Sequence, residues 1–376
     1  MSAIPDSVEL TRVLVAMDTV NPPGNEECVA RVLAELLQSA GFDVLLDEFA
    51  PGRSNVMARK GGGEGTLLFS GHMDTVPFGS APWSFDPLSG EIVDGRMFGR
   101  GTSDMKSGLA AMVCAAMRAA SAFGPNGPSL QLALTAAEET GCKGVAALRD
   151  RGLLCPVRAV LIAEPTSNRP RLGHKGVLWL KAGTKGRTAH ASSPELGDNA
   201  LLKALDLAER LRSFPFDGQS HPVLGEPSLA LTTFQAGASL NCIPDRAEIG
   251  LDIRTIPGLV HVELLGRLRQ TLGPELEALE VLDDQQGIWT EPDDPWALRV
   301  FEVVEGVTGK PCRVEGIRYF TDGSTLWEAC GQPATVILGP GEEGQAHMTD
   351  EFCPVENIRQ AEEIFTRLAL GWANGN

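Results

Sequence analysis

The sequence has no stretch of about 18 uncharged apolar residues, so nothing in its 376 residues fits a membrane-spanning helix. The first nine residues, MSAIPDSVE, lack the basic start and the apolar stretch of a secretory signal peptide. No CxxC pair occurs among the eight cysteines, and a chain of this length does not need disulfides to fold. These absences predict a cytoplasmic protein with no membrane partner.

Positive charge is also scarce, because 32 Lys and Arg face 49 Asp and Glu, a formal charge of −17. Such a chain repels nucleic-acid phosphates, so we expect no nucleic-acid partner. Glycine (42) and proline (25) are too few for a low-complexity chain, while 43% hydrophobic and 22% charged residues are ordinary globular values. The length favours two domains.

The first part of the chain alternates between strand and helix patterns. Near-continuous apolar runs at 66–70, 129–136 and 159–163 are typical of strands buried on both faces of an α/β sheet. An Ala-rich helix is predicted from residue 107. This alternation predicts an α/β layer with its functional loops at the strand ends.

The pattern changes near residue 175. Residues 175–288 contain a β-α-β-β-α-β succession that is complete in itself. Three of its four strands are placed, at 177–182, 229–234 and 247–254, and its two helices are predicted at 195–212 and 260–272. A helix at 295–308, a strand at 334–338 and a helix at 355–373 then resume the first pattern. We therefore predict that residues 1–174 and 289–376 form one domain, into which 175–288 is inserted.

Chemically versatile side chains follow the predicted strands. His72 ends the first apolar run, and Asp74 lies on the same side of an extended chain. A metal-binding histidine commonly donates its other ring N–H to a carboxylate, which would make Asp74 the residue that orients His72. A surface hydrogen bond is the simpler reading of this pair taken alone.

Four acidic residues and a second histidine also lie next to the ends of predicted strands or helices. Asp104 precedes the Ala-rich helix, where it could equally be a helix cap. Glu138 and Glu139 follow the run 129–136, where a solvated turn is the alternative, and Glu164 follows the run 159–163. His347 lies in a glycine-rich loop after the strand predicted at 334–338.

Together these residues suit a carboxylate-bridged pair of divalent ions. Two such ions polarise a carbonyl and bring the pKa of a bridging water toward neutrality, and a spare glutamate can then take its proton.

Five motifs carry a family resemblance: SGHMDTVP at 70–77, GRGTSDMK at 99–106, AEETGCKG at 137–144, EPT at 164–166 and AHMTDE at 346–351. The chain resembles the M20 metallopeptidase family, which contains acetylornithine deacetylase, succinyl-diaminopimelate desuccinylase, aminoacylase-1 and the glutamate carboxypeptidases. The resemblance implies an α/β fold with a mixed-sheet zinc-peptidase catalytic domain and an inserted α+β, ferredoxin-like lid through which a homodimer forms.

The resemblance also implies roles for the candidate residues. Asp104 would bridge two divalent metal ions, most simply Zn²⁺, with Co²⁺ or Mn²⁺ as substitutes. His72 and Glu164 would complete one site, and Glu139 and His347 the other. Glu138 would be the general base, with Asp74 behind His72, and the Asp104–Met105 peptide bond would be cis.

In the inserted segment, His190 resembles the lid histidine that stabilises the oxyanion, although it could also make only a local bond. Asn241 and Arg254 match positions that hold the substrate carboxylate, although Arg254 could simply pair with Asp252. Thr325 matches a substrate-contacting loop of the catalytic domain.

These roles predict hydrolysis of the amide bond of an N-acyl amino acid, in the manner of acetylornithine deacetylase or succinyl-diaminopimelate desuccinylase, by a water that Glu138 activates. The partner would be such a small molecule or a short peptide. A carboxypeptidase or dipeptidase is the alternative within the family. A single-metal aminohydrolase and a non-catalytic binding protein on the same fold are more distant alternatives.

Overall fold

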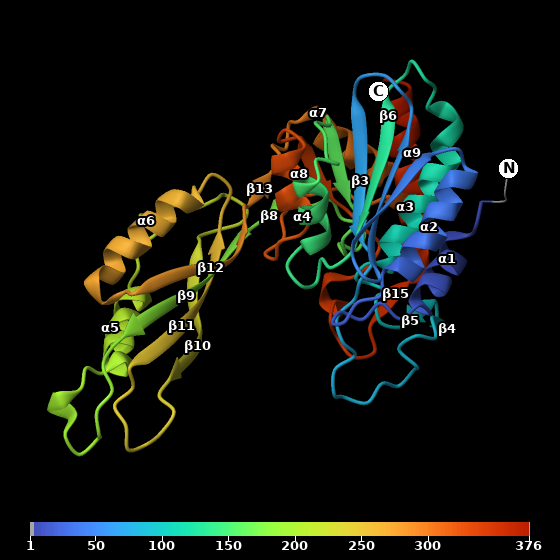
Figure 1. Cartoon of the computed structure of the whole chain (residues 1–376). Helices are drawn as coiled ribbons and strands as arrows, with labels where there is room; N and C mark the ends of the chain where they lie inside the picture. Colours follow the sequence, from blue (N-terminus) through green and yellow to red (C-terminus); the bar gives the residue numbers. More distant parts are fainter. Residues whose placement is uncertain (1–3, 376) are drawn as a thin grey trace. The chain divides into compact units, whose positions relative to one another are not determined.

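The computed structural model describes residues 4–375, and the chain divides into two compact units (Figure 1). The first unit consists of Met1–Gly173, Trp289–Gly316 and Thr321–Asn376. The second consists of His174–Ile288 and Ile317–Phe320. His174 and residues 317–320 therefore group with the second unit, whereas the sequence predicts the bounds 1–174, 175–288 and 289–376.

A six-stranded mixed sheet forms the centre of the first unit, in the order β1-β2-β6-β3-β7-β14. Four neighbouring strands, β6, β3, β7 and β14, run parallel, and β1 and β2 are antiparallel additions at one edge. Every residue of β3 and β6 is buried, in keeping with their largely apolar sequences. The strands are β1 (Asp43–Ala50), β2 (Arg53–Lys60), β3 (Thr66–His72), β6 (Ser129–Thr135), β7 (Ala159–Ile162) and β14 (Ala334–Ile337).

Helices cover both faces of this sheet. Figure 1 shows α1, α2, α3 and α9 on one side, and α4 and α8 on the other. The Ala-rich helix α3 is buried nearly throughout, and at Gly108 an added Cβ would lie 2.3 Å from the carbonyl oxygen of Ala163. The helices are α1 (Ser7–Val15), α2 (Glu27–Ser39), α3 (Lys106–Ala119), α4 (Lys143–Asp150), α7 (Pro295–Thr308), α8 (Gly323–Ala329) and α9 (Val355–Ala373).

A small antiparallel sheet lies in the same unit, in the order β15-β5-β4. Its strands are β4 (Glu91–Val93), β5 (Arg96–Phe98) and β15 (Phe352–Pro354). Because β15 directly follows the AHMTDE motif, this sheet ties the end of that loop to the segment before Asp104.

The second unit is a four-stranded antiparallel sheet in the order β10-β11-β9-β12. Its two helices pack on each other and on the sheet, which gives the unit its own apolar core. The elements are β9 (Gly176–Lys185), α5 (Ala200–Arg212), β10 (Ser228–Ala236), β11 (Arg246–Thr255), α6 (His261–Leu272) and β12 (Ala278–Gln285). Two short strands, β8 (Gly173–His174) and β13 (Ile288–Trp289), lie where the chain passes between the units.

One predicted helix begins later than expected. The pattern 195–212 predicts a single helix, but Pro194–Leu196 forms only a 3-10 turn and α5 begins at Ala200. The side chain of Asn199 accepts hydrogen bonds from the N–H groups of Leu201 and Leu202, so it caps the true start.

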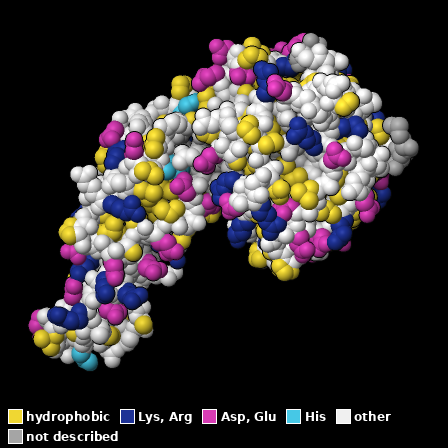
Figure 2. All heavy atoms as spheres, turned by 45° about the horizontal axis from the view of Figure 1, so that its top comes forward, with side chains coloured by type: hydrophobic (Ala, Val, Ile, Leu, Met, Phe, Trp, Pro, Cys, Tyr) yellow, Lys and Arg dark blue, Asp and Glu magenta, His cyan; other side chains and the backbone are white. Residues whose placement is uncertain are grey.

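Figure 2 shows Lys and Arg side chains interspersed with Asp and Glu on the visible face. Among residues 4–375, no helix combines the length and the apolar character that crossing a bilayer demands.

Candidate metal centre

The parallel strands of the first unit bring the predicted residues to one edge of the sheet. His72 is the last residue of β3, Glu138 and Glu139 follow β6, and Glu164 follows β7. Because β6, β3 and β7 are parallel neighbours, their carboxyl ends meet at the same edge. Asp104 comes from the loop before α3, and its peptide bond to Met105 is cis, as predicted.

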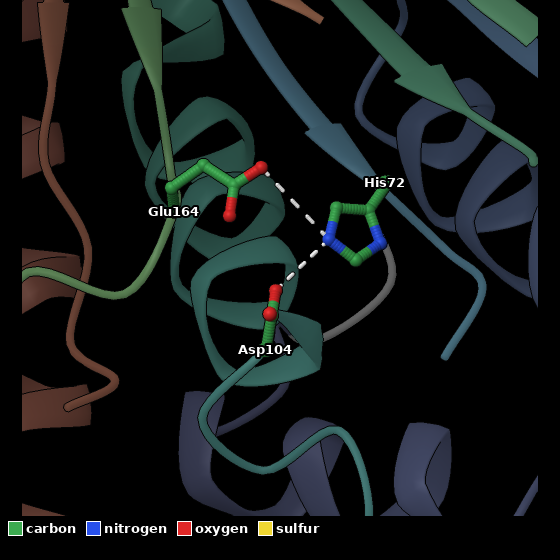
Figure 3. A group of neighbouring side chains, drawn as sticks. All are labelled: His72, Asp104 and Glu164. Atoms are coloured by element: carbon green, nitrogen blue, oxygen red, sulfur yellow. Dashed lines mark hydrogen bonds and ion pairs between the residues drawn. The ribbon is translucent and has the colours of Figure 1, made fainter. Parts of the chain in front are cut away.

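One group of potential ligands consists of His72, Asp104 and Glu164 (Figure 3). The Nε2 atom of His72 lies 3.0 Å from Oδ1 of Asp104 and 3.9 Å from Oε1 of Glu164. All three residues are buried. An imidazole and two carboxylates that point at one another in this way suit a divalent cation.

A second group consists of Asp104, Glu139 and His347. The Nε2 atom of His347 lies 3.1 Å from Oε2 of Glu139 and 3.4 Å from Oδ2 of Asp104. Asp104 therefore belongs to both groups, with Oδ1 facing His72 and Oδ2 facing His347. A carboxylate that serves two sites with its two oxygens has the arrangement of a bridging ligand.

The pKa values of the carboxyl groups reflect this crowding. Burial, and then the charge of Asp104, raise the pKa of Glu164 well above its usual range and also raise that of Glu139. Burial opposes ionisation of Asp104, but hydrogen bonds from His347 and His72 outweigh it and lower its pKa. Carboxylates packed so closely need compensating positive charge.

Without bound ions, the histidines supply that charge. Hydrogen bonds to Asp104 and Glu139 raise the pKa of His347 to about 10. Divalent cations would replace these protons, because metal binding to imidazole and carboxylate ligands displaces protons from them. The donor types, the shared Asp104 and the need of the carboxylates for positive charge therefore fit two divalent ions.

Glu138 belongs to neither group and lies in different surroundings. Burial raises its pKa well above the usual range, and its Oε1 lies 3.7 Å from the thiol of Cys142. Ligand atoms of Glu138, Cys142 and the buried Asp322 lie within 4.8 Å of one another. A glutamate beside the ligand groups with a raised pKa is suited to accept and return a proton.

Side chains from other segments hold the turn that carries Glu138 and Glu139 through hydrogen bonds to its backbone. Four successive N–H groups donate to buried side chains: Ala136 to Asn55 (3.0 Å), Ala137 to Glu26 (3.1 Å), and Glu138 and Glu139 to Asp74 (3.0 and 3.2 Å). Ala137 has φ of 60°, a left-handed conformation that persists where surrounding contacts impose it.

Asp74 therefore does more than the sequence predicted. Its carboxylate lies 3.6 Å from Nδ1 of His72, beyond hydrogen-bond length, while Nδ1 donates to the Asp74 carbonyl oxygen at 3.0 Å. Besides this contact with His72, the Asp74 side chain accepts hydrogen bonds from the backbone of Glu138 and Glu139 and from the amide of Asn21 at 2.8 Å.

Comparison with known proteins adds the family. The model of Peptidase family M20/M25/M40 matches residues 68–371. The chain belongs to this family. The matched residues include all five motifs of the sequence analysis.

Curated relatives of this M20 chain extend over nearly its whole length. It is 32% identical over 383 residues to acetylornithine deacetylase of Vibrio campbellii, covering 97% of this chain and 98% of that protein. It is 28% identical over 377 residues to a probable succinyl-diaminopimelate desuccinylase of Staphylococcus epidermidis, covering 92% of this chain and 93% of that protein. The crystal structure of an M20 family metallo-carboxypeptidase from Sulfolobus solfataricus superposes with a TM-score of 0.79 at 17% identity, covering 98% and 100%. The M20 chain is thus a metal-dependent amide hydrolase by family.

Three further candidates of the M20 chain lie in its second unit. Nδ1 of His190 accepts from the Ser192 N–H (3.1 Å) and lies 2.7 Å from the Ser192 hydroxyl, so a neutral ring carries its proton on Nε2. Asn241 is exposed and accepts a hydrogen bond from Ser239. Arg254 pairs with both carboxylate oxygens of Asp252, at 2.8 and 2.9 Å, which is the ion pair named as its alternative.

Thr325 lies in helix α8 rather than in a loop, and only 3% of its surface is exposed. Its contact with a substrate stays a prediction.

Sequence reasoning did not identify several residues that support the M20 site: Asn21, Glu26, Asn55, Arg100, Asp322 and Glu351. Arg100 and Glu351 lie inside the quoted motifs, so their place in those motifs was an available signal. Glu26 and Asn55 are far in sequence from the turn they hold, and no local pattern marks them.

Proposed function

We propose that this protein hydrolyses the amide bond between an acyl group and an amino acid that keeps a free carboxylate. The observation that carries this proposal is the juxtaposition of two ligand groups, joined by Asp104, with a glutamate that belongs to neither. The names of the curated relatives, a deacetylase and a desuccinylase of amino-acid derivatives, support this substrate class.

In this proposal His72, Asp104 and Glu164 hold one divalent ion, and Asp104, Glu139 and His347 hold the other. We propose zinc, because imidazole nitrogen and carboxylate oxygen are its usual ligands together with cysteine, and Co²⁺ or Mn²⁺ as substitutes. When bound, the ions supply polarisation of the scissile carbonyl and a lowered pKa for the attacking water.

Glu138 performs the proton transfers. Its carboxylate accepts the proton of the attacking water, and the resulting carboxylic acid passes that proton to the departing amine nitrogen. The raised pKa of Glu138 suits both steps, because a base that is too weak would not take the proton and one that is too strong would not release it. The hydrogen bonds from Glu138 and Glu139 to Asp74 fix the turn during both transfers.

We propose that the first unit is the catalytic domain and the second a ferredoxin-like lid through which the protein dimerises. The strand order β10-β11-β9-β12, with a helix after its first and third strands in sequence, supports this assignment. His190 would donate its Nε2–H to the oxyanion, and Arg254 with Asn241 would bind the substrate carboxylate.

The test is a panel of N-acetyl and N-succinyl amino acids, beside dipeptides, with the zinc- and cobalt-loaded protein. We expect cleavage of the N-acyl amino acids. Preferential cleavage of dipeptides would favour the carboxypeptidase or dipeptidase alternative, and cleavage of neither would favour a binding protein. Activity that is complete at one metal equivalent would favour a single-metal enzyme.

A further inference from the structure

Arg100 and Glu351 form a buried ion pair beside the proposed metal centre. The Nη1 atom of Arg100 lies 2.6 Å from Oε2 of Glu351, with 2% and 0% of the two side chains exposed. Neither residue belongs to a ligand group among the described residues. Burying two charges costs desolvation free energy, so a buried ion pair is weak evidence for a role in stability. Its role is better judged from the other groups that the two side chains contact.

Glu351 holds the loop that carries Asp104. Its Oε1 accepts from the N–H groups of Ser103 (2.7 Å) and Asp104 (3.0 Å), and its Oε2 accepts from the N–H of Gly101 (3.0 Å). Three of the four N–H groups from 101 to 104 thus end on one carboxylate. The position of the Asp104 backbone depends directly on Glu351.

Arg100 connects the same carboxylate to two other loops. Nη1 also donates to the carbonyl oxygen of Met348 (3.2 Å), the residue after His347. Nη2 donates to the carbonyl oxygen of Pro77 (3.1 Å), in the loop that follows His72 and Asp74. The guanidinium carbon lies 5.2 Å from the Trp83 ring centre, a cation–π contact that holds the group in place.

We propose that Arg100 and Glu351 are positioning residues that set the separation of Asp104 and His347. They thereby set the affinity of the protein for its second metal ion, the one that we assign to Asp104, Glu139 and His347. The inference rests on the proposed metal centre and extends it. The pair acts through backbone groups, since Glu351 holds the Asp104 loop and Arg100 holds the carbonyl next to His347. A shift of either loop would open the distance between Oδ2 of Asp104 and Nε2 of His347, now 3.4 Å.

The variant E351Q tests this directly. Glutamine keeps the size of the side chain, but its NH₂ group must face N–H donors on one side or the other, so the loop must move. The matched control is E362Q, which removes the carboxylate from another arginine pair, Arg118 with Glu362, between α3 and α9. The metal-free proteins are titrated with Co²⁺ alone and followed by visible absorption, and their Tm values are measured in parallel.

We expect E351Q to bind the second Co²⁺ equivalent about 10- to 100-fold more weakly, as is typical when a residue that orients a ligand is lost. E362Q should bind both equivalents as the unaltered protein does. An E351Q protein with a lower Tm but unchanged affinity for both equivalents would overturn the inference, because the pair would then be structural only.

The variant R100K covers the case in which E351Q does not fold. Lysine keeps a positive charge against Glu351 but cannot donate to Met348 and Pro77 with the geometry of the guanidinium fork. We expect weaker binding of the second equivalent, and unchanged affinity in R100K would overturn the inference. The Co²⁺ titration uses no substrate, so it is independent of the substrate panel. If the unaltered protein bound two Co²⁺ equivalents but cleaved no amide of the panel, the proposed function would be refuted and the inference about Arg100 and Glu351 would still stand.

Discussion

At the scale of single residues, Glu138 and Glu139 are neighbours in sequence with different surroundings. Glu139 meets the imidazole of His347, whereas Glu138 meets the thiol of Cys142 and the buried Asp322. Burial and hydrogen bonding thus divide two identical side chains into a metal ligand and a base in our proposal.

Replacing Glu138 by Gln should separate these roles. We expect E138Q to retain two metal equivalents and to lose about 10³-fold in kcat, within the usual range for removal of a general acid–base. Metal analysis and steady-state kinetics check both parts. A near-normal rate in E138Q would show that another group moves the proton.

Replacing Asp104 should differ from replacing Glu138 in its effect on metal binding. Because Asp104 contributes one oxygen to each ligand group, we expect D104A to lose affinity for both ions as well as activity. Equilibrium dialysis against zinc measures the loss. D104A with two bound equivalents would contradict the bridging role.

His174 in the second unit should make stability depend on pH. Burial lowers its pKa to about 4 from 6.5, and its Nε2 has no hydrogen-bond partner within the described residues. The unfolded chain therefore binds more protons than the folded chain between these values, and stability falls as the pH falls through that window. From pH 7.5 to 5.0 the loss from this residue is about 2 kcal/mol.

The variant H174Q cannot titrate, so urea unfolding at the two pH values should show a loss smaller by about 2 kcal/mol than in the unaltered protein. Equal losses in the two proteins would contradict the assignment.

At the scale of elements, the start of α5 depends on one side chain. Asn199 caps two N–H groups of the first turn, and we expect N199A to lower the free energy of unfolding by about 1 kcal/mol. The control is E209A on the exposed part of the same helix, where the change should stay within about 0.5 kcal/mol. Denaturant titration of both variants measures the difference, and equal stabilities would contradict the cap.

The elements differ in how well the sequence predicted them. The predicted bounds of α7 and α9 match the structure, because both helices have a long amphipathic pattern. Helices α4 and α8 have eight and seven residues and were not predicted, since their patterns are too short to distinguish from loops.

The candidate site was predicted more completely than its supports. Each ligand candidate follows a strand or precedes a helix, and the parallel sheet then brings the strand ends together. The acceptors Glu26, Asn55 and Glu351 hold backbone N–H groups of distant loops, and such contacts depend on tertiary packing that sequence periodicity does not encode.

At the scale of the whole molecule, the proposed catalytic residues are distributed over both units. All five proposed ligands and Glu138 belong to the first unit, whereas His190 belongs to the second. We expect H190A to bind two metal equivalents normally and to lose about 10²- to 10³-fold in kcat, as for loss of an oxyanion donor. Metal content and kinetics test this together, and an unchanged kcat would show that His190 makes only its local bonds.

The insertion of the second unit after Gly173 has a consequence for how such proteins diversify. The residues that we propose to hold the ions and to move the proton lie outside the inserted segment, as do Asp74, Arg100 and Glu351, which support them. Recombination that exchanges the segment for one of another sequence would keep the proposed ligands and base, but would keep the full rate only if the new segment supplied an oxyanion donor in place of His190. Selectivity could then evolve by replacement of the segment, under the constraint that this one donor is retained.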